Sequence, residues 1–107
     1  MCGALVDTQY VTFIRAVIVD FADARTERFF RDGAVPPQWR AFAKIAARKL
    51  DMLDAAPQLA ALRSPPGNRL EALRRDRVGR HSIRINDQWR VCFRWTKAGP
   101  ADVEIVD

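Results

Sequence analysis

Cysteine is scarce in this sequence, because only Cys2 and Cys92 occur among 107 residues. One lies next to the N-terminus and the other within a strand pattern, and this placement supports neither a disulfide framework nor a metal site. We therefore expect two reduced thiols, as in cytosolic proteins, and neither a bound metal nor a cofactor.

Long apolar runs are also absent. The apolar stretch at residues 10–22 is interrupted by Arg15 and Asp20 and is too short to cross a bilayer, and no basic region precedes it as in a signal peptide. We expect a cytoplasmic protein. A chain of this length supports one hydrophobic core, so we divide it into a weakly specified N-terminal extension, residues 1–15, and one domain, residues 16–107.

Acidic residues are too few to balance the basic ones. The chain has 18 Lys and Arg against 13 Asp and Glu, which gives a formal charge of +5. Residues 69–94 contain eight arginines and three acids, so this one segment carries the whole excess. A localised basic stripe is typical of proteins that bind a phosphate backbone, although a solvated arginine face would have the same composition.

Two helices are predicted ahead of the basic segment. The first covers residues 24–32, where Asp20 or Asp23 can cap its start and Gly33 can end it. The second covers residues 36–56, in which apolar side chains recur at helical spacing. That stripe consists of Phe42, Ile45, Ala46, Leu50 and Leu53, with Lys49 at its edge.

Strands are predicted on both sides of these helices. A β-branched run at residues 17–19 suits a first strand. After one further helical turn at residues 58–62 and a Ser-Pro-Pro-Gly breaker, the apolar period changes to 2. The expected strands cover residues 69–73, 81–85, 89–95 and 102–106. The fold class is therefore α+β, in the order β-α-α-β-β-β-β, with two N-terminal helices packed on a mainly antiparallel sheet.

The register of the central hairpin follows from its side chains. A two-residue turn would mix apolar and charged side chains on each face of the sheet. A three-residue loop at residues 86–88 instead pairs Ile83 with Val91 and leaves one face apolar. The opposite face then carries Ser82, Arg84, Arg90, Cys92 and Arg94.

Two arginines, Arg84 and Arg90, lie directly opposite each other in this register. Like charges in such a position destabilise a sheet. The pair therefore requires an anionic ligand, or a nearby acid such as Glu71 or Glu104.

A resemblance to a known family begins with the segment RLEALRRDRVGRHSIRINDQWRVCFRW at residues 69–95. It extends over about residues 17–107 and includes FADARTERFF, LRSPPGNRLEAL, HSIRINDQWRVCF and GPADVEIVD. In order and spacing these motifs resemble the HigB-type toxins, the plasmid maintenance system killer family of the RelE/ParE superfamily, and GraT-like members in particular.

The resemblance implies a RelE/ParE-like single domain that cuts mRNA on the ribosome and inhibits translation and growth. Its partners would be a cognate HigA-like helix-turn-helix antitoxin and the ribosome with mRNA, with no membrane. In this family a ribose 2′-hydroxyl attacks the adjacent phosphodiester without a metal and without a covalent intermediate. Such chemistry requires a base, cationic groups for the phosphate and an acid for the leaving oxygen.

Three residues take catalytic positions of the family pattern. Arg74 stands where the family has a lysine, Glu71 where it has a histidine, and Arg90, in the QWR motif, matches a phosphate-clamping arginine. Arg90 is the strongest candidate, because a guanidinium stays ionised and can contact a phosphate through two parallel hydrogen bonds. Glu71 either accepts the 2′-hydroxyl proton or pairs with a neighbouring arginine.

The other arginines of the basic segment are candidate RNA contacts, each of which could equally be a solvated surface charge. They are Arg69, Arg75, Arg77, Arg80, Arg84 and Arg94. His81 is expected to pack on the apolar face with Ile83 rather than transfer protons. Trp89 and Trp95 are expected in the core.

The sequence departs from the family pattern after Asp107, where HigB-like chains close with Asp-Tyr-His. The departure implies either a longer natural chain or impaired activity. Two alternative functions stay open at this point. One is a ParE-like inhibitor of DNA gyrase, because one fold serves both targets, and the other is a non-catalytic module that binds RNA or an antitoxin.

Overall fold

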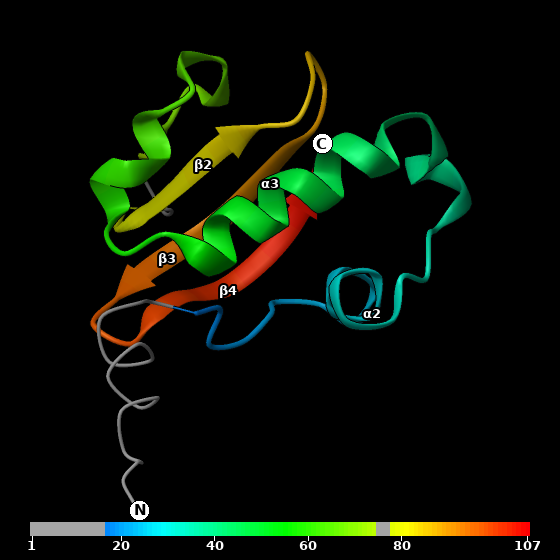
Figure 1. Cartoon of the computed structure of the whole chain (residues 1–107), viewed down its shortest axis with the longest axis horizontal. Coiled ribbons are helices and arrows are strands. Elements are labelled where there is room, and N and C mark those ends of the chain that lie inside the picture. The colour runs from blue at the N-terminus through cyan, green and yellow to red at the C-terminus, as the bar shows by residue number, and fades with distance from the viewer. Residues whose placement is uncertain (1–16, 75–77) are drawn as a thin grey trace, which may run out of the picture.

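A computed structural model describes residues 17–74 and 78–107 of the chain. Within them, two α-helices precede a four-stranded antiparallel sheet with the strand order β1-β2-β3-β4 (Figure 1). The helices are α2 (Ala24–Asp32) and α3 (Ala43–Ala55), and the strands are β1 (Glu71–Ala72), β2 (Arg80–Arg84), β3 (Arg90–Thr96) and β4 (Gly99–Val106). Short 3₁₀ helices lie at Pro37–Phe42, Leu59–Arg63 and Pro66–Asn68. The predicted α+β class is confirmed.

The segment before α2, residues 17–22, differs from the strand predicted there. Backbone hydrogen bonds of 2.8 to 3.2 Å hold it beside β4, but they form only an isolated parallel bridge, between Phe21 and Val103. At Asp102 the backbone of β4 is left-handed (φ 52°), and its N–H donates to the carboxylate of Asp20 (2.6 Å) instead of a backbone carbonyl. Asp102 therefore interrupts the pairing between the bond at Pro100 and the bridge at Val103, and no regular strand forms in residues 17–22.

The ends of α2 lie where the sequence predicts them. The Oδ1 atom of Asp23 accepts a hydrogen bond from the backbone N of Thr26 (2.6 Å) and caps the first turn. Gly33 ends the helix in a left-handed conformation (φ 75°), and its N–H donates to Phe29 O (3.1 Å). The hydroxyl of Thr26 also accepts from Ile105 N (3.2 Å), which ties α2 to β4.

Replacing Asp23 with alanine should lower the free energy of unfolding by about 1 kcal/mol, because the first turn of α2 loses its only side-chain cap. Urea denaturation followed by circular dichroism measures the change. Asp32→Ala is the matched control at the other end of the same helix, where a negative charge opposes the helix dipole. An equal loss in both variants would contradict a capping role for Asp23.

The second helix lies across one face of the sheet (Figure 1). Its predicted first turns are a 3₁₀ helix, Pro37–Phe42, and the α-helical part ends at Ala55, one residue before the predicted limit. Four members of the predicted stripe are buried: Phe42, Ala46, Leu50 and Leu53. The prediction is wrong for Ile45, which is 39% exposed. Neither this helix nor any other in residues 17–74 and 78–107 is long and apolar enough to cross a membrane.

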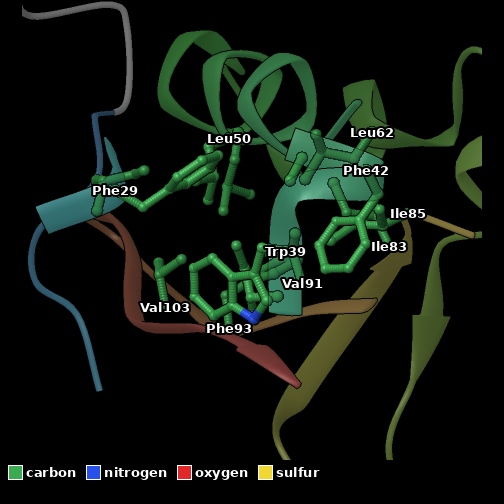
Figure 2. Packing of buried hydrophobic residues seen from close by; sticks show 14 of the residues in the cluster. Phe29, Trp39, Phe42, Leu50, Leu62, Ile83, Ile85, Val91, Phe93 and Val103 are labelled. Atoms are coloured by element: carbon green, nitrogen blue, oxygen red, sulfur yellow. The ribbon is translucent and has the colours of Figure 1, made fainter. Parts of the chain in front are cut away.

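The core lies between α3 and the apolar face of the sheet (Figure 2). The predicted three-residue loop is confirmed, since Ile83 pairs with Val91 and Arg84 with Arg90. The largest fully buried side chain is Trp39. The sheet contributes Ile83, Val91, Phe93, Val103 and Ile105 to the same core. With its apolar face filled in this way, the sheet turns its second face away from the core.

Candidate functional site

Charged side chains gather on the face of the sheet that is turned away from α3. Three cross-strand pairs make up this face: Arg84–Arg90, Ser82–Cys92 and Arg80–Arg94. The middle pair is buried, with exposed fractions of 0% for Ser82 and 3% for Cys92. The four arginines therefore fall into two groups, one toward each end of β2 and β3.

Arg90 is held by three neighbours. Its Nε donates to Ser82 Oγ (2.8 Å) and one terminal nitrogen donates to the carbonyl oxygen of Arg69 (3.0 Å). The same terminal nitrogen lies 3.4 Å from a carboxylate oxygen of Glu71. Because the donor at Nε and one amino group are both engaged, the plane of the guanidinium is fixed before any ligand arrives.

Two acids neutralise the opposed arginines, as the register requires. Glu71 pairs with Arg90, and Asp87 pairs with Arg84 at 2.5 Å. Both carboxylates face solvent, with side-chain exposed fractions of 59% for Glu71 and 100% for Asp87. Exposed ion pairs contribute only about 0 to 1 kcal/mol, so an incoming anion can displace these carboxylates at little cost.

These groups line one pocket of about 460 Å³, here named the Arg90 pocket. Its lining consists of Gly67, Arg69, Glu71, Arg84, Asn86, Asp87 and Arg90. The structure thus brings together four of the predicted site residues, three arginines and Glu71. Such a pocket can hold a phosphate among guanidinium groups with a carboxylate beside it as a proton acceptor.

Asn68 supports this pocket and was missed by the sequence analysis. It is fully buried, its Oδ1 accepts from Lys49 Nζ (2.6 Å), and its Nδ2 donates to the carbonyl oxygens of Leu62 (3.0 Å) and Ser64 (3.3 Å). In the sequence, an asparagine after Pro-Pro-Gly indicates only a turn. Nothing in the local pattern distinguishes it from a surface loop residue.

Lys49, the lysine at the edge of the predicted stripe, lies beside the same loop. Burial lowers the pKa of its ammonium group, and the charges of Arg48 and Arg84 lower it further. Lys49 belongs to α3, and its positive charge adds to that of Arg84, which lines the Arg90 pocket.

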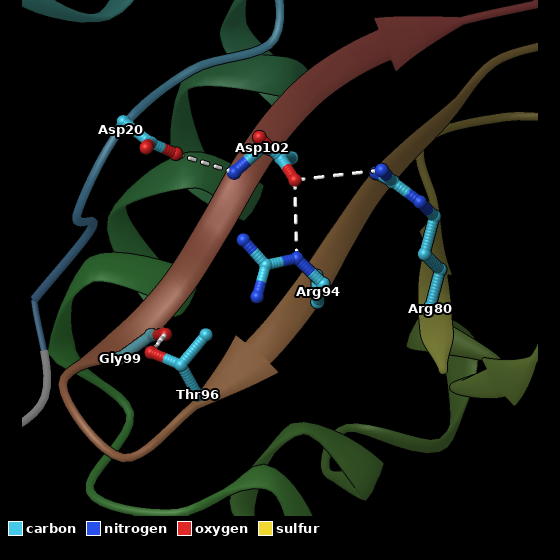
Figure 3. A network of polar contacts seen from close by, with 6 residues as sticks. All are labelled: Asp20, Arg80, Arg94, Thr96, Gly99 and Asp102. Atoms are coloured by element: carbon cyan, nitrogen blue, oxygen red, sulfur yellow. Dashed lines mark hydrogen bonds and ion pairs between the residues drawn. The ribbon is translucent and has the colours of Figure 1, made fainter. Parts of the chain in front are cut away.

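A second basic group lies toward the other end of the two strands (Figure 3). The carboxylate of Asp102 accepts from Arg94 Nε (3.1 Å) and pairs with a terminal nitrogen of Arg80 (3.4 Å). One carboxylate shared by two guanidinium groups leaves a positive charge on the surface. Arg80 and Arg94 were predicted as RNA contacts, and the structure places them on the same face as the Arg90 pocket but outside it.

Arg74, the third predicted catalytic residue, is exposed and does not line the Arg90 pocket. It follows β1, whose pairing continues with the hydrogen bond from Leu73 N to Arg80 O (2.8 Å). Three residues of extended chain, about 10 Å, separate it from Glu71. Arg75 and Arg77 lie outside the described residues.

The prediction that His81 packs on the apolar face is confirmed, whereas Trp89 and Trp95, predicted in the core, are only partly buried. The ring of His81 stacks on Phe93 with 6.2 Å between centroids, and its Nδ1 is buried without a hydrogen-bond partner. Trp89 and Trp95 pack against the core from its edge. Among residues 17–74 and 78–107, no three His, Cys, Asp or Glu side chains cluster in a way that could hold a metal ion.

Comparison with known proteins gives a consistent result. The model of a family described as RelE-like toxin of type II toxin–antitoxin system HigB matches residues 19–107. Toxin HigB-1 of Vibrio cholerae is 38% identical over 81 residues, which cover 72% of this chain and 82% of that protein. An uncharacterised Haemophilus influenzae protein is 44% identical over 52 residues, which cover 49% of this chain and 52% of its own length.

Among solved structures, a YoeB/ParE toxin from Agrobacterium tumefaciens is similar, with a TM-score of 0.46 and 17% identity. The match covers 85% of this chain and 93% of that one.

Proposed function

Because this chain belongs to the HigB-like, RelE-like toxins of type II toxin–antitoxin systems, we propose that it cleaves mRNA on the ribosome and that the Arg90 pocket is its active site. It is a toxin, from a family that inhibits translation and whose members are generally ribonucleases. As the toxin of such a system it has an antitoxin partner. Beyond this family membership, we propose the reaction mechanism, the residues of the site and the ribosome as the place of cleavage.

The fixed guanidinium of Arg90 is the observation that supports this site. Its anchors at Ser82 and Arg69 hold it at the wall of the pocket, where preorganised donors stabilise the charge that develops on a phosphate. Arg84 and Arg69 supply further positive charge from the same lining. Arg74, which is exposed just after β1 and outside the pocket, is proposed to contact the RNA next to the cleaved phosphate.

In the proposed reaction the ribose 2′-oxygen forms a bond to the adjacent phosphorus and the bond from phosphorus to the 5′-oxygen breaks. Glu71 is our candidate for the base that takes the 2′-hydroxyl proton, because its carboxylate lies 3.4 Å from Arg90 and therefore beside any phosphate bound there. The leaving 5′-oxygen takes a proton from water, so the proposed products are a 2′,3′-cyclic phosphate and a 5′-hydroxyl. The step requires neither a metal nor a covalent intermediate.

We also propose that the chain acts in the cytoplasm and that its antitoxin is a HigA-like helix-turn-helix protein. The second proposal is tested by expressing the chain together with the product of the neighbouring reading frame and isolating the complex. A neighbour without a helix-turn-helix domain that nevertheless neutralises the toxin would contradict it.

Inducing the chain in a bacterium, with and without Arg90→Ala, tests the main proposal. The expected result is growth arrest together with new 5′ ends inside translated messages, and the loss of both in the variant. Antitoxin binding should persist in Arg90→Ala, since the variant removes one side chain from an open pocket. Arrest without new 5′ ends would instead support an inhibitor of gyrase or a protein that only binds its target.

A further inference from the structure

We propose that Asn68 is a positioning residue, anchored to α3 by Lys49, that fixes the backbone of Arg69 and through it the guanidinium of Arg90. The inference deepens the proposed function and rests on it for its link to catalysis. Its structural part, the dependence of Arg90 on Asn68, stands independently of the reaction.

The loop at residues 62–69 wraps around one carboxamide. The two N–H groups of Asn68 are directed to the carbonyl oxygens of Leu62 and Ser64, and Met52 Sδ lies 3.8 Å from the same nitrogen. Backbone bonds from Asn68 N to Pro65 O (2.9 Å) and from Arg69 N to Pro66 O (3.1 Å) complete the loop. A fully buried side chain with every polar atom satisfied holds its surroundings in one geometry.

Lys49 connects this loop to the helix layer. Its ammonium group donates to Asn68 Oδ1 at 2.6 Å, a charge-assisted bond from an element that packs firmly against the sheet. The loop is thus fixed relative to α3, and α3 is fixed relative to β2 and β3 by the core. This contact therefore helps to fix the position of the loop against the sheet.

The residue that follows, Arg69, shows what the loop holds in place. Its backbone is left-handed, with φ 47° and ψ 58°, a conformation that costs a non-glycine residue energy and persists only where its surroundings impose it. Its carbonyl oxygen accepts the bond from Arg90 (3.0 Å). If the carboxamide of Asn68 is lost, Arg69 can relax to an ordinary backbone conformation and its carbonyl turns away from Arg90.

The chemistry of the contacts explains why the residue is an asparagine. Aspartate would keep the bond to Lys49 but could not donate to Leu62 O and Ser64 O. Leucine has a similarly branched side chain but is larger, and it would remove the bonds to Lys49 Nζ, Leu62 O and Ser64 O. Each substitution therefore changes the hydrogen bonds of the side chain while keeping a branched shape.

The test follows the Nε–H signal of Arg90 by nitrogen-15 NMR in the full 107-residue chain. This signal is assigned by its disappearance in Arg90→Lys, and its exchange with water should be slow because Nε donates to Ser82. In Asn68→Ala and Asn68→Asp we expect exchange at least about tenfold faster, and ribosome-dependent cleavage slower by about 10- to 100-fold, as expected when a catalytic group is displaced by about 1 Å. Lys49→Met, which keeps the loop bonds, should give a smaller change in the same direction.

The matched control is Thr26→Ala, which removes another fully buried polar side chain and its bond to β4. Thr26→Ala should lower the melting temperature about as much as Asn68→Ala does. The exchange of the Arg90 signal and the cleavage rate should nevertheless stay within twofold of the original chain. In an Arg90→Lys background, where cleavage is slow but still measurable, Asn68→Asp should have little further effect on cleavage, because Asn68 acts through the guanidinium that this background lacks.

Either of two results would overturn the inference: an unchanged Arg90 signal in both Asn68 variants, or an equal change in Thr26→Ala. Failure of the proposed function gives a different pattern. In that case the original chain cuts no message at all, while the Arg90 signal still reports whether Asn68 positions it.

Discussion

Replacing Arg90 with lysine should slow mRNA cleavage by about 100-fold, the cost of removing one preorganised donor from an oxyanion site, although the charge is kept. The guanidinium spans Ser82 Oγ and Arg69 O while facing the pocket. A lysine ammonium is a compact donor on a flexible stem and cannot bridge these two acceptors and a phosphate at once.

The effect should lie in the rate of cleavage rather than in binding. Long-range attraction to ribosomal RNA depends on total charge, which Arg90→Lys preserves. Single-turnover cleavage on purified ribosomes programmed with a short message, at several toxin concentrations, separates the two quantities. Arg31→Lys is the control, since Arg31 is a half-exposed arginine of α2 that pairs with Glu27. A rate within twofold of the original chain in Arg90→Lys would show that the geometry of the guanidinium is unimportant.

Local patterns carried the parts of the fold that the sequence predicted well. The cap at Asp23 and the stop at Gly33 depend on side chains within a few residues of each other. The hairpin register depends only on keeping Ile83 and Val91 on one face. In each case the physical cause lies inside the segment that was being interpreted.

The parts that the sequence did not predict depend on contacts between distant segments. The first strand was expected from its β-branched residues, but its pairing with β4 is interrupted where Asp102 departs from regular strand geometry, and only the bridge from Phe21 to Val103 remains. Asn68 has its role because Lys49, 19 residues earlier, reaches it from α3. No propensity or period in the sequence encodes such a meeting of segments.

The candidate site shows the same division. Family resemblance and charge singled out Arg90 and Glu71, and the structure places them in contact at 3.4 Å. The separation of Arg80 and Arg94 from the Arg90 pocket required coordinates, because all these arginines alternate onto one face in the sequence pattern. What divides them is the buried Ser82–Cys92 pair and the carboxylate of Asp102.

Replacing Trp39 with alanine should lower the free energy of unfolding by about 3 to 5 kcal/mol. Its indole is fully buried and contacts three aromatic rings at centroid distances of 5.5 Å (Phe29), 6.5 Å (Phe42) and 6.5 Å (Trp89). These rings come from α2, from the 3₁₀ helix that leads into α3 and from the hairpin. One truncation therefore opens a cavity where three parts of the fold meet.

Trp39→Phe separates the ring from its polar atom. The indole Nε1 is buried without a hydrogen-bond partner, so phenylalanine removes an unsatisfied donor while keeping an aromatic ring. We expect Trp39→Phe to lower the free energy of unfolding clearly less than Trp39→Ala does, as measured by urea denaturation followed by circular dichroism.

The control is Val35→Ala, at a 39% exposed position between α2 and the 3₁₀ helix Pro37–Phe42. It should change stability by no more than about 0.5 kcal/mol. Domains of this kind are stable by only about 5 to 15 kcal/mol, so the loss expected for Trp39→Ala is a large share of the total stability. A loss below about 1 kcal/mol in that variant would mean that the helices are not held to the sheet through this side chain.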